Sequence, residues 1–149
     1  MKKFKFALDT VLSYKQQILE SIEAEYAQLM AQVHRQEAVL DAVWQEYRAC
    51  NAEYRERKAE GLSITEAMIF ESSLRSGELH IQRETNRLEK LKAEAEAKRE
   101  EMVEAKIDTS SLEKLKDKKL AQYRKDEMKS EEQLVDEFIS ATRAVSASA

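Results

Sequence analysis

The chain of 149 residues contains no proline and only two glycines, Gly61 and Gly77. These two residue types supply most of the tight turns of folded proteins, so a sandwich, a barrel or an α/β domain could hardly be connected. Charged residues make up 36% of the chain, against roughly 25% in an average protein, and so many charges are difficult to bury in a compact core. The sequence therefore predicts an all-α protein with long, exposed helices.

Apolar residues recur in the first part of the chain at alternating steps of four and three. The series is Leu8, Leu12, Leu19, Ile22, Tyr26, Leu29, Val33, Leu40, Val43, Tyr47, Cys50 and Tyr54, and only Lys15 and Gln36 interrupt it. A repeat of 3.5 residues held over this length keeps one narrow stripe facing a partner helix. We call this stripe, together with its counterpart on the partner helix, the seam of a coiled coil.

The first stripe stops near Gly61, where a turn is expected. Glycine suits the position just past a helix end, and Ser63 and Glu66 have the spacing of a capping box that opens a new helix. A second stripe follows: Ala67, Phe70, Leu74, Gly77, Ile81, Glu84, Leu88, Leu91, Ala95, Lys98 and Met102. One continuous helix through Gly61 is the alternative, since a glycine inside a helix costs only about 1 kcal/mol.

The two stripes can be paired as an antiparallel hairpin, in which paired residue numbers have a constant sum. Pairing Tyr54 with Phe70 gives a sum of 124 and places Gly77 opposite Tyr47. A register that is slipped by one heptad fits the pattern nearly as well. The prediction is a single hairpin domain over residues 1–149, with helices at 4–59 and 64–140, a turn at 60–63 and a frayed tail at 141–149. Beyond about residue 119 the second helix would form a C-terminal overhang without a partner.

Little in the sequence could carry catalytic chemistry. It has no glycine-rich phosphate loop, and the single Cys50 can form no intramolecular disulfide. His34 and His80 would lie too far apart on the hairpin for one metal site, and no apolar run approaches the length of a membrane span. The net charge of −4 argues against nucleic acid as a partner. We therefore expect no enzyme activity, no cofactor and no bound metal.

Two features exceed the needs of a bare coiled coil. Aromatic residues crowd near the turn, namely Trp44, Tyr47, Tyr54 and Phe70; Trp44 lies one step off the seam, so it either forms part of a docking surface or merely flanks the seam. The second feature is a basic cluster, which could orient the molecule against an acidic partner or could be an ordinary solvated face. The cluster comprises Lys2, Lys3, Lys5, Lys114, Lys116, Lys118, Lys119, Arg124 and Lys125.

The residues resemble a known family at several points. The basic and aromatic opening Met1–Leu12, the block Leu112–Lys119, Tyr123 and the segment Glu132–Glu137 look like those of FliJ, the coiled-coil component of the bacterial flagellar type III export apparatus. The layout of Tyr47, Gly61, Phe70 and Leu74 fits as well, and the resemblance covers the whole chain.

The resemblance implies an antiparallel hairpin similar to the central stalk of rotary ATPases. It would insert into the hexameric flagellar export ATPase and activate it, contact the membrane export-gate protein and escort export chaperones. The protein would then be a monomeric rod in the cytoplasm, attached peripherally to the inner face of the membrane at the flagellar base. The basic cluster would face the ATPase ring.

The resemblance also implies a gate-docking patch near the turn. The matching residues are Gln36, Leu40, Tyr47, Phe70 and Leu74, to which we add Trp44, expected to be at least partly exposed, whereas Val43, Gly77 and Ile81 depart from the family pattern. Apart from Trp44, these residues belong to the predicted seam. Either the patch is partly buried, or the stripe faces outward near the turn.

Two alternatives to the flagellar stalk remain at this stage. One is a generic coiled-coil scaffold or chaperone, which could form a stable dimer through the helix overhangs. The other is a weak enzyme or metal protein, which would depend on His34, His80 or Cys50.

Overall fold

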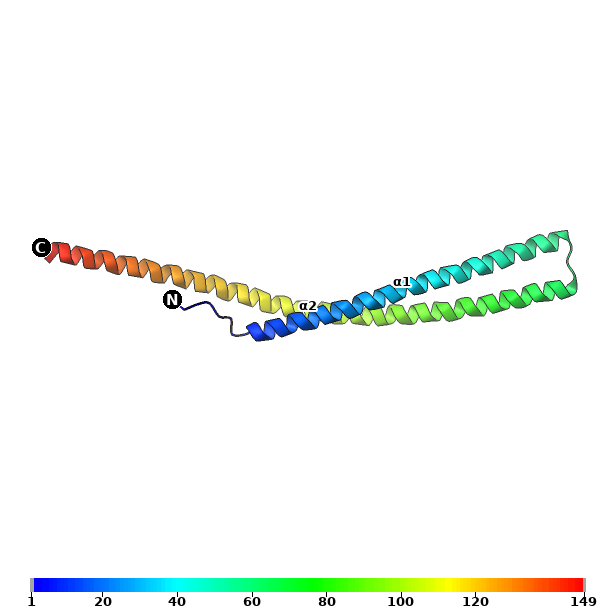
Figure 1. Cartoon of the computed structure of the whole chain (residues 1–149), viewed down its shortest axis with the longest axis horizontal. Coiled ribbons are helices and arrows are strands. Elements are labelled where there is room, and N and C mark those ends of the chain that lie inside the picture. The colour runs from blue at the N-terminus through cyan, green and yellow to red at the C-terminus, as the bar shows by residue number, and fades with distance from the viewer. Residues whose placement is uncertain (1, 149) are drawn as a thin grey trace. The chain divides into compact units, whose positions relative to one another are not determined.

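The computed structural model describes residues 2–148, and in this part of the chain it contains two helices and no strand (Figure 1). Helix α1 spans Asp9–Glu60 and helix α2 spans Ile64–Ser148. The two helices pack against each other as a hairpin, which confirms the predicted all-α fold class. The chain divides into two compact units, which are described separately. The central unit is residues 21–103, and the terminal unit is residues 2–20 with residues 104–148.

A three-residue turn joins the helices within the central unit (Figure 1). Gly61 adopts a φ of +107°, a left-handed conformation that suits glycine, and its N–H donates to the carbonyl of Arg57 at 3.1 Å. Ser63 caps α2, because its hydroxyl accepts a hydrogen bond from the Glu66 N–H at 3.2 Å. The Glu66 carboxylate reaches across the turn to Arg57 at 3.4 Å, so it ties the two helices together.

The core of the central unit lies along the predicted seam. Val33, Leu88 and Ala95 are buried together, and α1 and α2 both contribute to this cluster. The partly buried side chains packed around it are Tyr26, Leu29, Met30, Leu40 and Leu91. The 3.5-residue stripe is therefore the side of each helix that faces its partner, as the periodicity predicts.

Contacts across the central unit agree with the predicted pairing. The rings of Tyr54 and Phe70 stack with centroids 5.1 Å apart. A Cβ atom added to Gly77 would lie 3.0 Å from Cδ2 of Tyr47, so the tyrosine ring fills the space that the glycine leaves. The residue numbers of both pairs add to 124, the sum expected from the sequence.

In the terminal unit, α1 begins at Asp9 rather than near residue 4, and residues 2–8 are not helical. Lysines in a first helical turn oppose the helix dipole, whereas an acidic residue there is favourable. Asp9 occupies the first turn and also pairs with Lys116 of α2 at 2.8 Å. The segment before it packs against α2 through Phe4, whose ring lies 5.6 Å from that of Tyr123.

Helix α2 continues further along the terminal unit than expected. It passes unbroken through Thr109, whose buried hydroxyl donates to the carbonyl of Ala105 at 2.8 Å. It then extends to Ser148, whereas the sequence suggested fraying from residue 141; Ala149 lies outside the described residues. No proline or glycine interrupts this stretch, and the hydroxyl of Thr142 donates within the helix to the carbonyl of Phe138 at 2.8 Å.

Candidate partner-binding surfaces

The aromatic patch near the turn centres on Trp44, which is 37% exposed. Its ring meets that of Tyr47 edge to face, with centroids 5.9 Å apart and planes at 88°. The Arg48 guanidinium lies 5.4 Å from the indole ring. An aromatic pair and a cation that brace one another present a preorganised surface, which lowers the entropic penalty of binding.

Tyr47 is held from two further directions. Its ring rests against the backbone at Gly77, and its hydroxyl donates to the Glu78 carboxylate at 3.1 Å. This hydrogen bond, together with burial, raises the pKa of Tyr47 above its ordinary value of 10.0. The tyrosine is therefore a neutral, fixed part of the patch at physiological pH.

The other predicted docking residues belong to the seam. Gln36 is only 7% exposed, and Leu40 packs against the central core. Phe70 is half-buried in its stack with Tyr54, and Leu74 is half-buried too. Of the six residues proposed for gate docking, only Trp44 is exposed.

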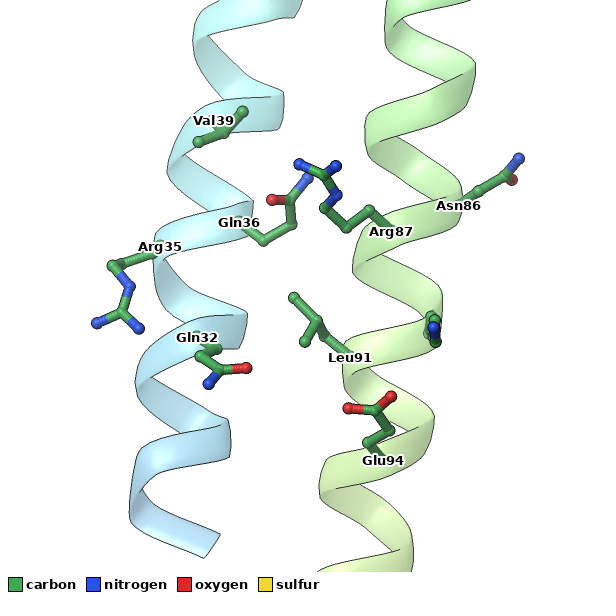
Figure 2. A pocket seen from close by; sticks show the side chains of 9 residues that line it. Gln32, Arg35, Gln36, Val39, Asn86, Arg87, Leu91 and Glu94 are labelled. Atoms are coloured by element: carbon green, nitrogen blue, oxygen red, sulfur yellow. The ribbon is translucent and has the colours of Figure 1, made fainter. Parts of the chain in front are cut away.

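A shallow groove that sequence reasoning missed lies beside Gln36 in the central unit. Figure 2 shows Gln36, Arg87 and Leu91 pointing toward the space between the two helices, with Arg87 beside Gln36 and Leu91 below them. The Gln36 amide donates to the backbone carbonyl of Glu84 at 3.1 Å and also to the Glu84 carboxylate. The lining residues are Gln32, Arg35, Gln36, Val39, Asn86, Arg87, Lys90, Leu91 and Glu94. The only sequence signal was the interruption of the apolar stripe at Gln36.

The predicted basic cluster gathers in the terminal unit, where every member except Lys116 is exposed. Lys116 is half-buried and forms the ion pair with Asp9. Lys2, Lys3 and Lys5 lie on the nonhelical segment that packs against α2. The Tyr123 hydroxyl donates to the backbone carbonyl of Lys2 and so fastens this segment to the helix.

A groove runs between residues 2–8 and α2. It combines apolar side chains with cations, and its only carboxylate is that of Asp126. The lining residues are Lys2, Lys3, Phe4, Lys5, Phe6, Ala7, Leu8, Leu115, Lys119, Gln122, Tyr123 and Asp126. The sequence placed the lysines near one another, but the contact between Phe4 and Tyr123 depends on a segment that is not helical, which helical periodicity could not reveal.

Titratable groups do not converge on a catalytic or metal site in residues 2–148. No group of three or more His, Cys, Asp or Glu residues in that range could hold a metal ion. His34 lies 4.0 Å from Glu37, and His80 lies 3.8 Å from Glu84. Cys50 is half-buried and shares a shallow cavity with His80, an arrangement across the two helices that spacing along one helix could not indicate.

Neither helix has an apolar window long enough to cross a bilayer, judged over the residues that the structure describes. The fold and its surfaces define a helical-hairpin coiled-coil protein with an aromatic patch and a basic cluster on its surface. Comparison with family models gives a more particular answer, because the model described as the flagellar FliJ protein matches residues 4–148. The chain therefore belongs to the FliJ family and is a component of the flagellar export apparatus. Comparisons with curated proteins and with solved structures gave no significant match.

Proposed function

We propose that this protein is a non-enzymatic, stalk-like activator of the hexameric flagellar export ATPase. The observation that carries the proposal is the groove in the terminal unit, where lysines before α1 and Lys119 of α2 surround exposed apolar side chains. Such a surface suits a partner that has an apolar contact area surrounded by acidic residues. The positive charge of the groove would steer the encounter with the ATPase ring. The nine cations of the basic cluster come from two distant parts of the sequence and all lie in this one unit.

Charge reversal in the cluster tests this proposal. Lys3→Glu, Lys5→Glu and Lys119→Glu together should raise the concentration needed for half-maximal stimulation of ATP hydrolysis by roughly tenfold, which corresponds to about 1.4 kcal/mol. The matched control reverses three exposed cations of the central unit, Arg55, Arg83 and Lys92. Equal stimulation by both triple variants would contradict the basic cluster as the ring-facing surface. No stimulation by the wild-type protein would contradict the activator function itself.

We also propose that the aromatic patch docks to the membrane export gate. Trp44 would be the anchor, because exposed tryptophans dominate interface energetics and its neighbours fix its orientation. The remaining predicted residues, Gln36, Leu40, Tyr47, Phe70 and Leu74, would support the anchor from the seam. Because these residues are buried or half-buried in the seam, only part of each side chain could contact the gate protein.

Trp44→Ala should weaken binding to the cytoplasmic part of the gate protein by roughly thirtyfold, the effect typical of an interface hot spot. Tyr14→Ala is the matched control, since Tyr14 is an exposed aromatic residue of the terminal unit. Fluorescence anisotropy with a labelled gate fragment measures both affinities. A Trp44→Ala variant that binds like wild type would remove the patch from the proposal.

The same role includes escort of export chaperones, a monomeric state and peripheral attachment at the cytoplasmic face of the membrane. Family membership supports this wider role. Multi-angle light scattering checks the monomeric state directly. A stable dimer would favour a generic coiled-coil scaffold instead.

A further inference from the structure

Charged residues in the middle of the central unit are sorted between the two sides of the hairpin. The stretch in question is residues 30–46 of α1 and residues 78–94 of α2, which face each other in the observed register. The seam divides a coiled coil into two sides, and the heptad position of a residue decides on which side it lies. We call the side that carries the groove beside Gln36 the groove side, and the opposite one the Trp44 side.

The groove side is basic. Its cations in this stretch are Arg35, Arg83, Arg87 and Lys90, and all of them except Arg83 line the groove. Its two carboxylates, Glu46 and Glu94, lie at the two ends of the stretch. Among the four cations, only Arg87 has an ion-pair partner within residues 2–148, namely Glu84 at 3.8 Å. A ligand in the groove would therefore meet positive charge that the protein leaves uncompensated.

The Trp44 side is acidic. Its carboxylates are Glu37, Asp41, Glu78 and Glu89, and its single cation is Lys92. The remaining carboxylate of the stretch, Glu84, lies in the seam, where the Gln36 amide donates to it and His80 Nε2 lies 3.8 Å away. The two sides thus have opposite signs, and a partner that approaches the groove side encounters a local positive potential although the chain as a whole is acidic.

The groove between these cations has an apolar floor. Val39 is 43% exposed, and Leu91 is half-buried and points toward the space between the helices (Figure 2). The stretch between Glu46 and Glu94 is about 24 Å long at 1.5 Å per residue. An extended peptide of about seven residues spans that length. The groove therefore suits a short ligand that combines negative charge with an apolar side chain.

Two other occupants fit the groove side poorly. A flat anionic membrane would touch the outermost residues of the helices, and in this stretch the outermost heptad positions carry no charge, as at Leu79 and Asn86. A second copy of the chain could offer its acidic side. A rod laid along the groove would, however, extend past both ends and bring carboxylates against Glu46 and Glu94, which is repulsive.

We propose that the groove side binds a short acidic segment of a partner protein that carries an apolar side chain. The apolar side chain would lie over Val39 and Leu91, while carboxylates on either side of it would pair with Arg35 and Lys90. The charges would select acidic segments over neutral ones of the same shape. The groove lies in the central unit and away from Trp44, so the inference depends neither on activation of the export ATPase nor on docking through Trp44.

Two synthetic probes test the inference against the full-length protein. Both are fluorescently labelled peptides of seven residues with leucine at the centre. The acidic probe carries aspartate and glutamate around the leucine, and the amide probe carries asparagine and glutamine instead. By fluorescence anisotropy, the acidic probe should bind at least tenfold more tightly, and the difference should shrink at about 1 M salt because the Debye length then falls to about 3 Å.

Variants on the two sides of the hairpin separate specific binding from general effects of charge. Arg35→Gln combined with Lys90→Gln should weaken the acidic probe about tenfold. Lys92→Gln combined with Arg99→Gln is the matched control, because both are exposed cations that line a cavity on the Trp44 side, and it should leave the affinity unchanged. Glu94→Gln removes the carboxylate at the end of the groove and should tighten binding about threefold, a gain that misfolding could not produce.

The inference is overturned if the two probes bind equally or if the Arg35 and Lys90 variant binds the acidic probe like wild type. Phosphatidylserine vesicles and the wild-type protein alone supply two further tests. Binding to the vesicles that this variant abolishes, without binding of the acidic probe, would assign the groove side to a membrane surface. Oligomers of the wild-type protein that the same variant dissociates in light scattering would assign it to a second copy of the chain.

Discussion

Replacing Gly77 by alanine tests the closest helix–helix approach in the central unit. Alanine favours a helix interior over glycine by about 1 kcal/mol, so at an open site the substitution would stabilise the protein. Here the new Cβ atom would lie 3.0 Å from Cδ2 of Tyr47. Carbon atoms prefer separations of about 3.5–4.0 Å, so the tyrosine ring must retreat by roughly 0.5–1 Å.

The ring cannot retreat freely, because its hydroxyl is bonded to Glu78 and its edge contacts Trp44. Forcing an extra carbon atom into a packed site typically costs about 1–3 kcal/mol. Set against the gain in helix propensity, Gly77→Ala should change the free energy of unfolding by between about 0 and −2 kcal/mol. With the ring removed by Tyr47→Ala, the same substitution should raise the free energy of unfolding by about 1 kcal/mol.

Urea denaturation of the four proteins, followed by circular dichroism, gives this double-mutant cycle. The expected coupling between the two positions is about 1–3 kcal/mol. If Gly77→Ala stabilises the protein equally in both backgrounds, the ring is not constrained against the glycine and the packing argument is wrong.

Three further substitutions have defined outcomes. Ser63→Ala removes the cap on the Glu66 N–H and should lower the free energy of unfolding by about 1 kcal/mol in urea denaturation, whereas Ser63→Asp should preserve it. Thr109→Val replaces a hydroxyl that is only 3% exposed and bonds within its own helix, so it should raise stability by up to about 1 kcal/mol; a loss of more than that would indicate a required hydrogen bond. Lys98→Met tests pH dependence: the Glu25 carboxylate raises the pKa of Lys98 above 10.5, so the contribution of this lysine is complete below pH 10.5 and is lost as pH rises through the raised value. The stability difference between wild type and Lys98→Met should therefore narrow at strongly alkaline pH, and an unchanged difference would contradict the ion pair.

The hairpin could be predicted from sequence because its determinants are local or periodic. A left-handed glycine at Gly61 and a cap at Ser63 act within a few residues of the turn, so their residue types suffice to locate it. The start of α1 was harder to predict from the sequence, because the segment before it packs against α2 through Phe4 and Tyr123, which are remote in sequence. Periodicity alone extends a helix until a breaker appears, and the N-terminal segment contains none.

The surfaces were harder to predict than the fold, because exposure depends on what the partner helix covers. Gln36 and Phe70 have residue types suited to docking, but the second helix buries or half-buries both. The exposed apolar residues near the end of α2 could not be predicted for the opposite reason. The 3.5-residue seam carries no information beyond the end of the partner helix, where Val135 and Ile139 follow the ordinary helical spacing of four residues and residues 131–148 are exposed.

The polar interruptions of the seam resolve an ambiguity that the apolar pattern leaves open. An apolar stripe with a 3.5-residue period fits a partner shifted by one heptad nearly as well, because each leucine or valine meets another apolar residue. Gln36 and Glu84 interrupt opposite stripes, and in the structure they bond to each other. Lys98 likewise interrupts the second stripe and finds Glu25 at 2.7 Å. A shifted register would separate the side chains of both pairs, so these polar residues favour the alignment that places Tyr47 against Gly77.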